Sequence, residues 1–337
     1  MTLQALSDRI RDAADRKVAL RLRGGGSKDF YGNEVRGELL DTRGYAGIVD
    51  YEPSELVLTA RCGTPLAEVE AALSGKGQCL PFEPPHFGAA TFGGCVAAGL
   101  SGPRRASAGA LRDFVLGVKL VDGRGRVMQF GGQVMKNVAG YDVSRLAAGS
   151  LGTLGLIAEA SLKVLPRAAM DVTLRLEMDE ARALDAMNRW AAEPLPISAT
   201  LWHAGLLDLR LSGSEAAVRA ARARLGGTEV PDEWRAIREQ THPFFAGDAP
   251  LWRLSVPSTT PSLGLANLIE WGGALRWTRG AHPGPIPGGH ATLFRGGDKS
   301  AGVFAPLAPA LLRVHRALKS AFDPAGILNP GRLYAEI

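Results

Sequence analysis

Residues 136–157, with the sequence Lys-Asn-Val-Ala-Gly-Tyr-Asp-Val-Ser-Arg-Leu-Ala-Ala-Gly-Ser-Leu-Gly-Thr-Leu-Gly-Leu-Ile, carry a glycine-rich turn directly into an apolar run. Glycines at positions 149, 152 and 155 leave backbone without side chains, so a flat ligand can approach the main chain closely. The spacing Gly149-x-x-Gly152-x-x-Gly155 also suits an ordinary turn between a helix and a strand. Its meaning therefore depends on the other glycine-rich segments of the chain.

A second glycine segment, Arg23-Gly24-Gly25-Gly26-Ser27-Lys28, follows a run that predicts a strand. Three consecutive glycines allow positive φ angles and let successive N–H groups converge on one point, which is the geometry of an anion-binding nest. Asp29 excludes two common phosphate loops, because it stands where a P-loop has Ser or Thr and where a Rossmann fingerprint has its third glycine. Taken alone, the segment is equally compatible with a flexible hairpin turn.

The third segment, Thr91-Phe92-Gly93-Gly94, begins an apolar helix that contains many small residues. Such a helix lets a planar group lie against its backbone, although close packing of the helix in a core would need the same residues. Each of the three segments is a weak signal by itself. Their order along the chain is typical of one family of flavoproteins and predicts FAD as the cofactor.

Composition describes a globular protein rather than a membrane or nucleic-acid-binding one. The 337 residues are 46% hydrophobic and 22% charged, with a net charge of +5, and the length favours two domains. We expect no transmembrane segment, because no run reaches the roughly 18 apolar residues of a membrane span. We also expect a cytoplasmic protein, because the pattern of Met1 to Arg16 predicts an amphipathic helix rather than a secretory signal. The arginines are scattered, which argues against nucleic acid.

Cysteine usage excludes an iron–sulfur or zinc site built by this chain alone. Cys62, Cys79 and Cys95 show no Cys-x-x-Cys spacing. The odd count also argues against a disulfide framework. We therefore expect no metal site, and any iron–sulfur cluster that takes electrons from this chain must belong to another subunit.

Apolar periodicity predicts an α+β chain. For the first half we expect the N-terminal helix, strands at Val18 to Arg23 and Leu56 to Ala60, a helix at Leu66 to Leu73 with Thr64 as its N-cap, a hairpin of Phe114 to Val121 and Arg126 to Phe130 turning at Asp122-Gly123, and a strand from Leu156 to Leu165. For the second half we expect strands at Val172 to Glu177, Ile197 to Trp202, Leu206 to Leu211, Trp252 to Val256 and Ala274 to Trp277, helices at Glu180 to Trp190, from Ser214 and at Pro306 to Phe322, and an exposed connection at Gly280 to Gly289.

Several segments resemble the FAD-binding domain of the vanillyl-alcohol oxidase and p-cresol methylhydroxylase family, and most closely the smaller FAD-binding subunits of bacterial glycolate oxidases. The resemblance is dense over roughly residues 20 to 170 and returns near the C-terminus. The segments that carry it are Glu83-Pro84-Pro85-His86-Phe87-Gly88, Gly99-Leu100-Ser101-Gly102-Pro103-Arg104-Arg105, Arg112-Asp113-Phe114-Val115-Leu116-Gly117, Val134-Met135-Lys136-Asn137-Val138-Ala139-Gly140-Tyr141-Asp142 and Phe322-Asp323-Pro324-Ala325-Gly326-Ile327-Leu328-Asn329-Pro330-Gly331-Arg332.

This resemblance implies a set of cofactor-binding residues. The first loop would hold the FAD pyrophosphate, the segment from Thr91 would follow the flavin and ribityl chain, and the last glycines would close on the nucleotide half. The implied residues are Gly24, Gly25, Gly26, Ser27, Lys28, Thr91, Gly93, Gly94, Ser101, Gly102, Gly109, Gly152, Gly155 and Ile157. Asn329 and Arg332 would return to the flavin edge.

Departures from the family pattern bear on the chemistry. Members that bind flavin covalently carry a histidine just after the first loop, whereas Ser27 and Lys28 follow it here, so we expect non-covalent FAD. Related 2-hydroxy-acid dehydrogenases use a His-x-His pair for a metal, and none of the six histidines forms such a pair. The sequence does not assemble a complete base and carboxylate clamp, and the catalytic candidates are His290, Arg279 and Arg295.

The resulting prediction is an α+β flavoprotein with a PCMH-type FAD-binding domain of two α+β subdomains (residues 1–168), a small antiparallel-sheet cap domain (169–295) and a C-terminal segment (296–337) that returns to the FAD domain. The resemblance implies an FAD-binding subunit of a glycolate oxidase. It would act on a 2-hydroxy acid and pass electrons to a larger flavin subunit and an iron–sulfur subunit, with membrane association only through these partners. Two alternatives remain: a self-sufficient FAD-dependent 2-hydroxy-acid dehydrogenase, and a non-catalytic assembly subunit with the same fold.

Overall fold

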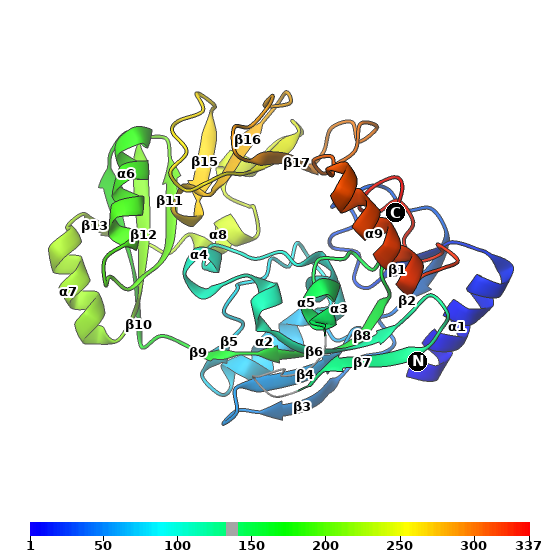
Figure 1. Ribbon diagram of the computed structural model, residues 1–337. Coiled ribbons are helices and arrows are strands. Elements are labelled where there is room, and N and C mark those ends of the chain that lie inside the picture. The colour runs from blue at the N-terminus through cyan, green and yellow to red at the C-terminus, as the bar shows by residue number, and fades with distance from the viewer. Residues whose placement is uncertain (133–140) are drawn as a thin grey trace.

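The computed structural model describes residues 1–132 and 141–337, which form two antiparallel sheets with helices packed between and around them (Figure 1). The first part of residues 136–157 and much of the segment 134–142 quoted above lie outside the described residues. Two short strand pairs complete the sheets: β1 (Leu20–Arg23) with β2 (Glu38–Asp41), and β5 (Gln78–Cys79) with β9 (Leu165–Pro166). The mixture of helices and sheets confirms the predicted α+β class.

The N-terminal helix α1 (Leu3–Arg16) forms because its apolar residues recur at helical spacing behind a Thr2 N-cap. Its buried face includes Leu6 and Ile10, which are fully buried in one cluster with Leu20 of β1. Strand β1 pairs in parallel with β2 and also bridges to Leu328 near the C-terminus. The two ends of the chain therefore meet around β1.

The five-stranded sheet has the order β3-β4-β8-β6-β7, and all neighbours are antiparallel. Its strands are β3 (Ile48–Glu52), β4 (Val57–Arg61), β8 (Leu156–Lys163), β6 (Val115–Val121) and β7 (Val127–Gly131). Helices α2 (Leu66–Ser74), α3 (Phe92–Ala98) and α5 (Val143–Ala147) pack on it. Strand β8 is buried over seven of its eight residues. Its two buried polar side chains have partners on the neighbouring strands, because Glu159 binds Lys119 and Ser161 binds Thr59.

Three local predictions for this region were wrong in detail. Thr64 is not the N-cap of α2; Pro65 is, and Thr64 Oγ1 accepts a hydrogen bond from Gly47 N at 2.9 Å instead. The β6–β7 connection is not a two-residue turn at Asp122-Gly123, because Asp122 N bonds to Arg126 O and the loop is longer. Strand β8 ends at Lys163, and the two residues of β9 pair with β5.

The second sheet has eight antiparallel strands in the order β13-β10-β12-β11-β15-β16-β14-β17. The strands are β13 (Thr228–Val230), β10 (Met170–Glu177), β12 (Leu206–Gly213), β11 (Ile197–His203), β15 (Asn267–Glu270), β16 (Leu275–Arg279), β14 (Leu251–Ser255) and β17 (His290–Arg295). The predicted antiparallel sheet is confirmed, and it is larger than expected because β13, β15 and β17 were not among the predicted strand ranges. The proline- and glycine-rich run before β17 forms no helix or strand, as expected.

Helices α6 (Glu180–Ala191) and α7 (Glu215–Leu225) pack on this sheet, while α4 (Arg105–Ala108) and α8 (Trp234–Arg238) lie between it and the N-terminal half (Figure 1). The predicted boundary at residue 168 falls between β9 and β10. Short 3-10 helices at Leu111–Phe114, Pro243–Phe245 and Trp271–Gly273 complete the elements of the described ranges.

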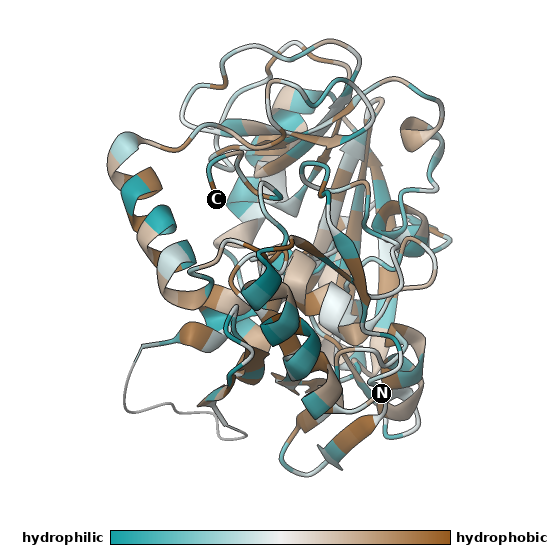
Figure 2. Cartoon of the chain, turned by 90° about the vertical axis from the view of Figure 1, so that its right-hand side faces the viewer, coloured by the Kyte–Doolittle hydropathy of each residue, from teal (hydrophilic) through white to brown (hydrophobic). Residues whose placement is uncertain are grey.

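After β17 the chain returns toward β1 through α9 (Pro309–Phe322), as Figure 1 shows. Figure 2 views the side that carries both chain ends, where the helices mix hydrophilic and hydrophobic residues along their length. The tail that follows α9 inserts Ile327 and Leu328 into the cluster around β1, and both side chains are buried. The predicted return of the C-terminal segment to the first half brings it to the site described next.

Candidate functional site

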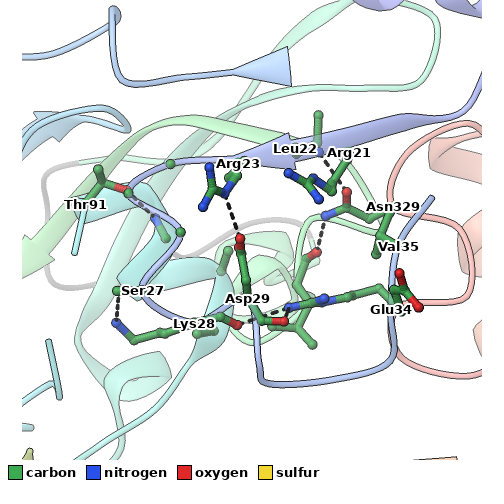
Figure 3. Close-up of a pocket in the computed structure, with 18 of the residues that line it drawn as sticks. Arg21, Leu22, Arg23, Ser27, Lys28, Asp29, Glu34, Val35, Thr91 and Asn329 are labelled. Atoms are coloured by element: carbon green, nitrogen blue, oxygen red, sulfur yellow. Dashed lines mark hydrogen bonds and ion pairs between the residues drawn. The ribbon is translucent and has the colours of Figure 1, made fainter. Parts of the chain in front are cut away.

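A cavity of about 380 Å³ lies where the loop after β1, the start of α3 and the C-terminal tail meet (Figure 3). Its walls include the whole loop from Gly24 to Lys28, together with Thr91 and Gly94 of the glycine segment at 91–94. Leu151 from the glycine segment at 136–157 and Asn329 from the tail close the far side. Segments that are distant in sequence therefore converge on one space, as the glycine pattern predicts.

The glycine loop packs so closely that side chains cannot replace its first two glycines. A Cβ on Gly24 would lie 2.1 Å from Thr91 Oγ1, and one on Gly25 would lie 1.5 Å from the carbonyl oxygen of Ala89. Gly26 has a φ of +74°, where only glycine is unstrained. The glycines thus let the loop lie directly against the start of α3, whose N-cap is Thr91.

Positive charge dominates this cavity. Among the described lining residues, five cationic side chains face two carboxylates: Arg21, Arg23, Lys28, Lys299 and Arg332 against Asp29 and Glu34. One of these pairs is neutralised, because Arg23 Nε lies 2.7 Å from Asp29 Oδ2. The remaining excess of cations makes the cavity a site for an anion.

Lys28 and Arg332 are partly buried cations without a carboxylate at ion-pair distance among the described residues. Burial lowers the pKa of Lys28, whose Nζ donates to the carbonyl oxygen of His86 at 3.2 Å. Burial also lowers the pKa of Arg332, whose Nη2 donates to Lys28 O at 3.1 Å. Burying charges is costly unless something compensates them, so the arrangement favours an anionic ligand that would.

The C-terminal tail holds the cavity together through Asn329. Its Oδ1 accepts a hydrogen bond from Leu22 N at 2.8 Å, and its Nδ2 donates to Leu151 O at 2.7 Å. Figure 3 shows Asn329 reaching across to β1 from the tail. A Cβ on Gly152 would lie 2.9 Å from Asn329 Nδ2, so Gly152 leaves the space that this side chain occupies.

The remaining cofactor-binding candidates lie outside the lining of this cavity. Gly93 packs on Cys62, Gly155 packs on Leu120, and Ile157 is 3% exposed in the core of β8. Ser101 and Gly102 line a second, smaller cavity that faces the eight-stranded sheet. Gly109 ends α4 with a φ of +110°.

The catalytic candidates are not brought together. His290 is exposed at the start of β17 and pairs with Ser255, whereas Arg279 and Arg295 both lie opposite Leu251 at the other end of the sheet. Their guanidinium groups donate to backbone carbonyls of the 244–246 segment. None of the three lines either cavity.

Some lining residues were missed by the sequence analysis. Lys299 follows β17 and donates to Gly32 O at 2.9 Å, and Arg21, Glu34 and Val35 flank the first loop without any recognisable pattern. The contact of Lys299 joins residues 267 positions apart. No local signal in the sequence could have found it.

Comparison with known proteins identifies the family. A family model described as an FAD binding domain matches residues 2–131, and one described as the C-terminal domain of FAD linked oxidases matches residues 290–333. The chain is 49% identical over 345 residues to the glycolate oxidase subunit GlcE of Escherichia coli, covering 99% of this chain and 98% of the relative. The chain belongs to the PCMH-type family of FAD-linked oxidases.

More distant members of this family match mainly in part. The glycolate oxidase subunit GlcD of Bacillus subtilis is 34% identical over 38% of this chain and 27% of its own length. A D-lactate dehydrogenase of Archaeoglobus fulgidus is 30% identical over 53% of this chain and 40% of its own length. A solved alkyldihydroxyacetonephosphate synthase shares the fold, with a TM-score of 0.69 at 16% identity over 97% of this chain and 75% of that one.

Membership of this family makes the protein an FAD-binding oxidoreductase, and the cavity fits the cofactor. FAD carries a pyrophosphate, which needs cations and backbone N–H groups, and the cavity offers unpaired, partly buried cations beside a loop that only glycine can form. Across residues 1–132 and 141–337, no helix combines the length and the apolar character that crossing a membrane requires.

Proposed function

We propose that this protein is the FAD-binding subunit of a glycolate oxidase, which oxidises a 2-hydroxy acid and passes the electrons to partner subunits. The identity of 49% over nearly the whole of both chains supports this assignment, because it includes both halves and the returning tail. The observation that carries the proposal is the cationic cavity in which Gly24–Lys28, Thr91 and Asn329 meet.

In this proposal, the loop from Gly24 to Lys28 holds the pyrophosphate of FAD. Lys28 and Arg332 supply the charge, and backbone N–H groups of the loop and the start of α3 supply hydrogen bonds. Bound FAD supplies the two-electron acceptor chemistry that protein side chains lack. The chain itself contributes a shaped, positively charged site that orients the cofactor and excludes water from its buried parts.

The cofactor is held without a covalent bond. Ser27 and Lys28 occupy the positions after the glycine loop, and neither provides an imidazole or a thiolate for flavin attachment. His86 lies near Lys28, but its Nε2 is 2.9 Å from Glu70 Oε2 and is engaged there. Cys95 is buried and its pKa is raised to about 12 by burial, which keeps it a thiol rather than a reactive thiolate.

Electrons from this flavin pass to partners. The three cysteines of the chain are all free, and among the described residues no cluster of His, Cys, Asp or Glu could hold a metal ion. An iron–sulfur subunit and a larger flavin subunit would therefore complete the electron path. Association with a membrane would come through those partners.

Anaerobic absorbance spectroscopy tests the proposal. The purified chain and then the chain with its partners are each mixed with glycolate, and the flavin band near its visible maximum is followed. We expect the flavin to be reduced in the complex and the electrons to reach an added acceptor only there. Full reduction and acceptor turnover by the chain alone would instead identify a self-sufficient dehydrogenase, and a chain that takes up no FAD yet restores the complex would identify an assembly subunit.

A further inference from the structure

A second, smaller cavity of about 30 Å³ lies between the two halves of the molecule. Leu100, Ser101 and Gly102, just after α3, form one wall. Strands β14, β15 and β16 of the eight-stranded sheet contribute the opposite wall, with Arg253, Glu270 and Trp277 among its residues. The indole Nε1 of Trp271 donates to Gly102 O at 3.0 Å and holds the two walls together.

Five polar side chains line this otherwise apolar cavity: Ser101, Arg238, Gln240, Arg253 and Glu270. Glu270 is 4% exposed, and its carboxylate accepts a hydrogen bond from Trp277 Nε1 at 2.8 Å. Gln240 is 8% exposed, and its Oε1 has no hydrogen-bond partner among the described residues. A buried acceptor without a partner lowers the free energy of unfolding by about 1–3 kcal/mol. A ligand that donates a hydrogen bond to Gln240 Oε1 would remove this cost.

Arg253 brings a cation to the same space. Its guanidinium lies 5.2 Å from the ring centre of Trp271, and Arg105 lies 4.5 Å from that ring. The described residues place no carboxylate within ion-pair distance of Arg253. Arg253 shares a side-chain hydrogen bond with Tyr31. The cavity therefore combines a guanidinium without a carboxylate partner, an unpaired acceptor and a buried carboxyl group, which complement a small molecule that carries both a carboxylate and a hydroxyl group.

Size narrows the ligand further. A water molecule needs roughly 10–15 Å³ of such space, so the cavity has room for about two or three waters. A two-carbon hydroxy acid, with five non-hydrogen atoms, is of comparable size. A longer acid would have to displace the surrounding aromatic side chains, of which Trp277 and Phe294 stack with ring centres 4.9 Å apart.

The cavity also lies next to the cofactor site. Ala97 and Ala98 of α3 line the larger cavity, and the residues from Leu100 onward line the smaller one, so one short segment borders both. Lys28 of the larger cavity lies 5.7 Å from the ring centre of Phe87, which lines the smaller one. A molecule in the smaller cavity would thus sit beside the site proposed for FAD.

We propose that this smaller cavity binds the 2-hydroxy acid substrate, with its carboxylate on Arg253 and its hydroxyl group donating to Gln240 Oε1 beside Glu270. The inference rests on the proposed function and adds the residues that recognise the substrate and the preference for a two-carbon acid. Gln240 selects a ligand with a hydroxyl donor, and the closed aromatic wall selects a short one.

Glu270 makes the binding depend on pH. Burial raises the pKa of this carboxyl group to about 7, and the groups that face it are Arg253 from β14, Trp277 from β16, Arg238 from α8 and Glu83 from the N-terminal half. A neutral Glu270 does not repel an anionic ligand, whereas an ionised one does. Glycolate should therefore bind more tightly at pH 6 than at pH 8.

Calorimetric titration of the FAD-loaded chain with glycolate tests the proposal. The flavin is first reduced with dithionite so that turnover does not obscure binding, and FAD content is measured from the oxidised spectrum beforehand. We expect Arg253→Met and Gln240→Ala each to weaken glycolate binding at least tenfold, with FAD content unchanged. D-lactate should bind at least tenfold more weakly than glycolate, and Glu270→Gln should remove the difference between pH 6 and pH 8.

The matched control is Arg316→Met, on the exposed surface of α9, which should bind glycolate normally. Arg253→Lys keeps the charge and guards against misfolding of the methionine variant; it should recover part of the affinity. Full FAD content with equal glycolate affinity in Arg253→Met and the unsubstituted protein would overturn this proposal while leaving the proposed function standing. A chain that binds no FAD would contradict the proposed function itself.

Discussion

Asn329, eight residues before Ile337, accepts a hydrogen bond from the backbone N–H of Leu22 at a distance of 2.8 Å, across 307 positions of sequence. The same side chain donates to Leu151 O, so one amide joins the tail, β1 and the glycine turn before β8. All three segments border the cofactor cavity. The C-terminus therefore completes the site that the first loop begins.

Replacing Asn329 with alanine should destabilise the protein and weaken FAD binding together. The change leaves a backbone donor and a backbone acceptor without partners, and the cost of two such groups is roughly 2–4 kcal/mol. Thermal unfolding followed by circular dichroism, with and without added FAD, measures both effects. An unchanged melting temperature would show that the tail is not needed to hold β1.

Gly25→Ala should abolish FAD binding while Gly75→Ala should not. The added Cβ at position 25 would lie 1.5 Å from the carbonyl of Ala89, so the loop must move away from α3. At position 75, the nearest atoms to an added Cβ are 3.6 Å away, which is ordinary contact. Flavin content per chain after purification and reconstitution is the measurement, and normal flavin in Gly25→Ala would count against the assigned loop.

Lys28→Met should separate cofactor affinity from stability. Removing a partly buried cation relieves the cost of its desolvation, so the cofactor-free protein should unfold at the same temperature or higher. FAD affinity should fall at least tenfold, because the pyrophosphate loses a charge partner. Lys17→Met, at an exposed position, is the control for the loss of one lysine. Fluorescence titration with FAD measures the affinity of both variants. Equal FAD affinities in the two variants would refute the role of Lys28.

Glu270→Gln should stabilise the protein at alkaline pH. The pKa of Glu270 rises from its ordinary 4.5 to about 7 on folding. The contribution of this group to the free energy of unfolding is therefore fully present below pH 4.5 and is lost as the pH rises through 7. Since one pKa unit corresponds to 1.36 kcal/mol, the free energy of unfolding at pH 8 is lower by roughly 3 kcal/mol than it would be with Glu270 protonated. Chemical denaturation of both proteins at pH 5 and pH 8 should show a gain for the variant that is much larger at pH 8; a gain independent of pH would contradict the buried carboxyl group.

Much of the fold could be predicted from local patterns. The apolar residues of 156–165 predict β8, which is buried over seven of its eight residues, and Thr91 before two glycines marks the start of α3. The prediction of Thr64 as the N-cap of α2 was wrong because its hydroxyl group bonds instead to the backbone of Gly47, which is distant in sequence. Strands β13 and β15 have three and four residues, too few for their alternation to be read.

The site was predictable only where glycine chemistry decides it. The loop at 24–28 signals an anion site through its own backbone, whereas Lys299 reaches the cavity through a contact that no local pattern records. The catalytic candidates Arg279 and Arg295 rest on an expected position on late strands of the second domain that face the flavin. Strand register places both opposite Leu251, where they bind backbone carbonyls.

Acid precipitation of the purified chain, followed by a spectrum of the supernatant and the pellet, tests the central claim most directly. The account predicts a yellow protein that releases a stoichiometric amount of FAD into the supernatant and takes it up again after refolding. A colourless protein that binds no FAD on reconstitution, or a flavin that stays with the pellet, would contradict it.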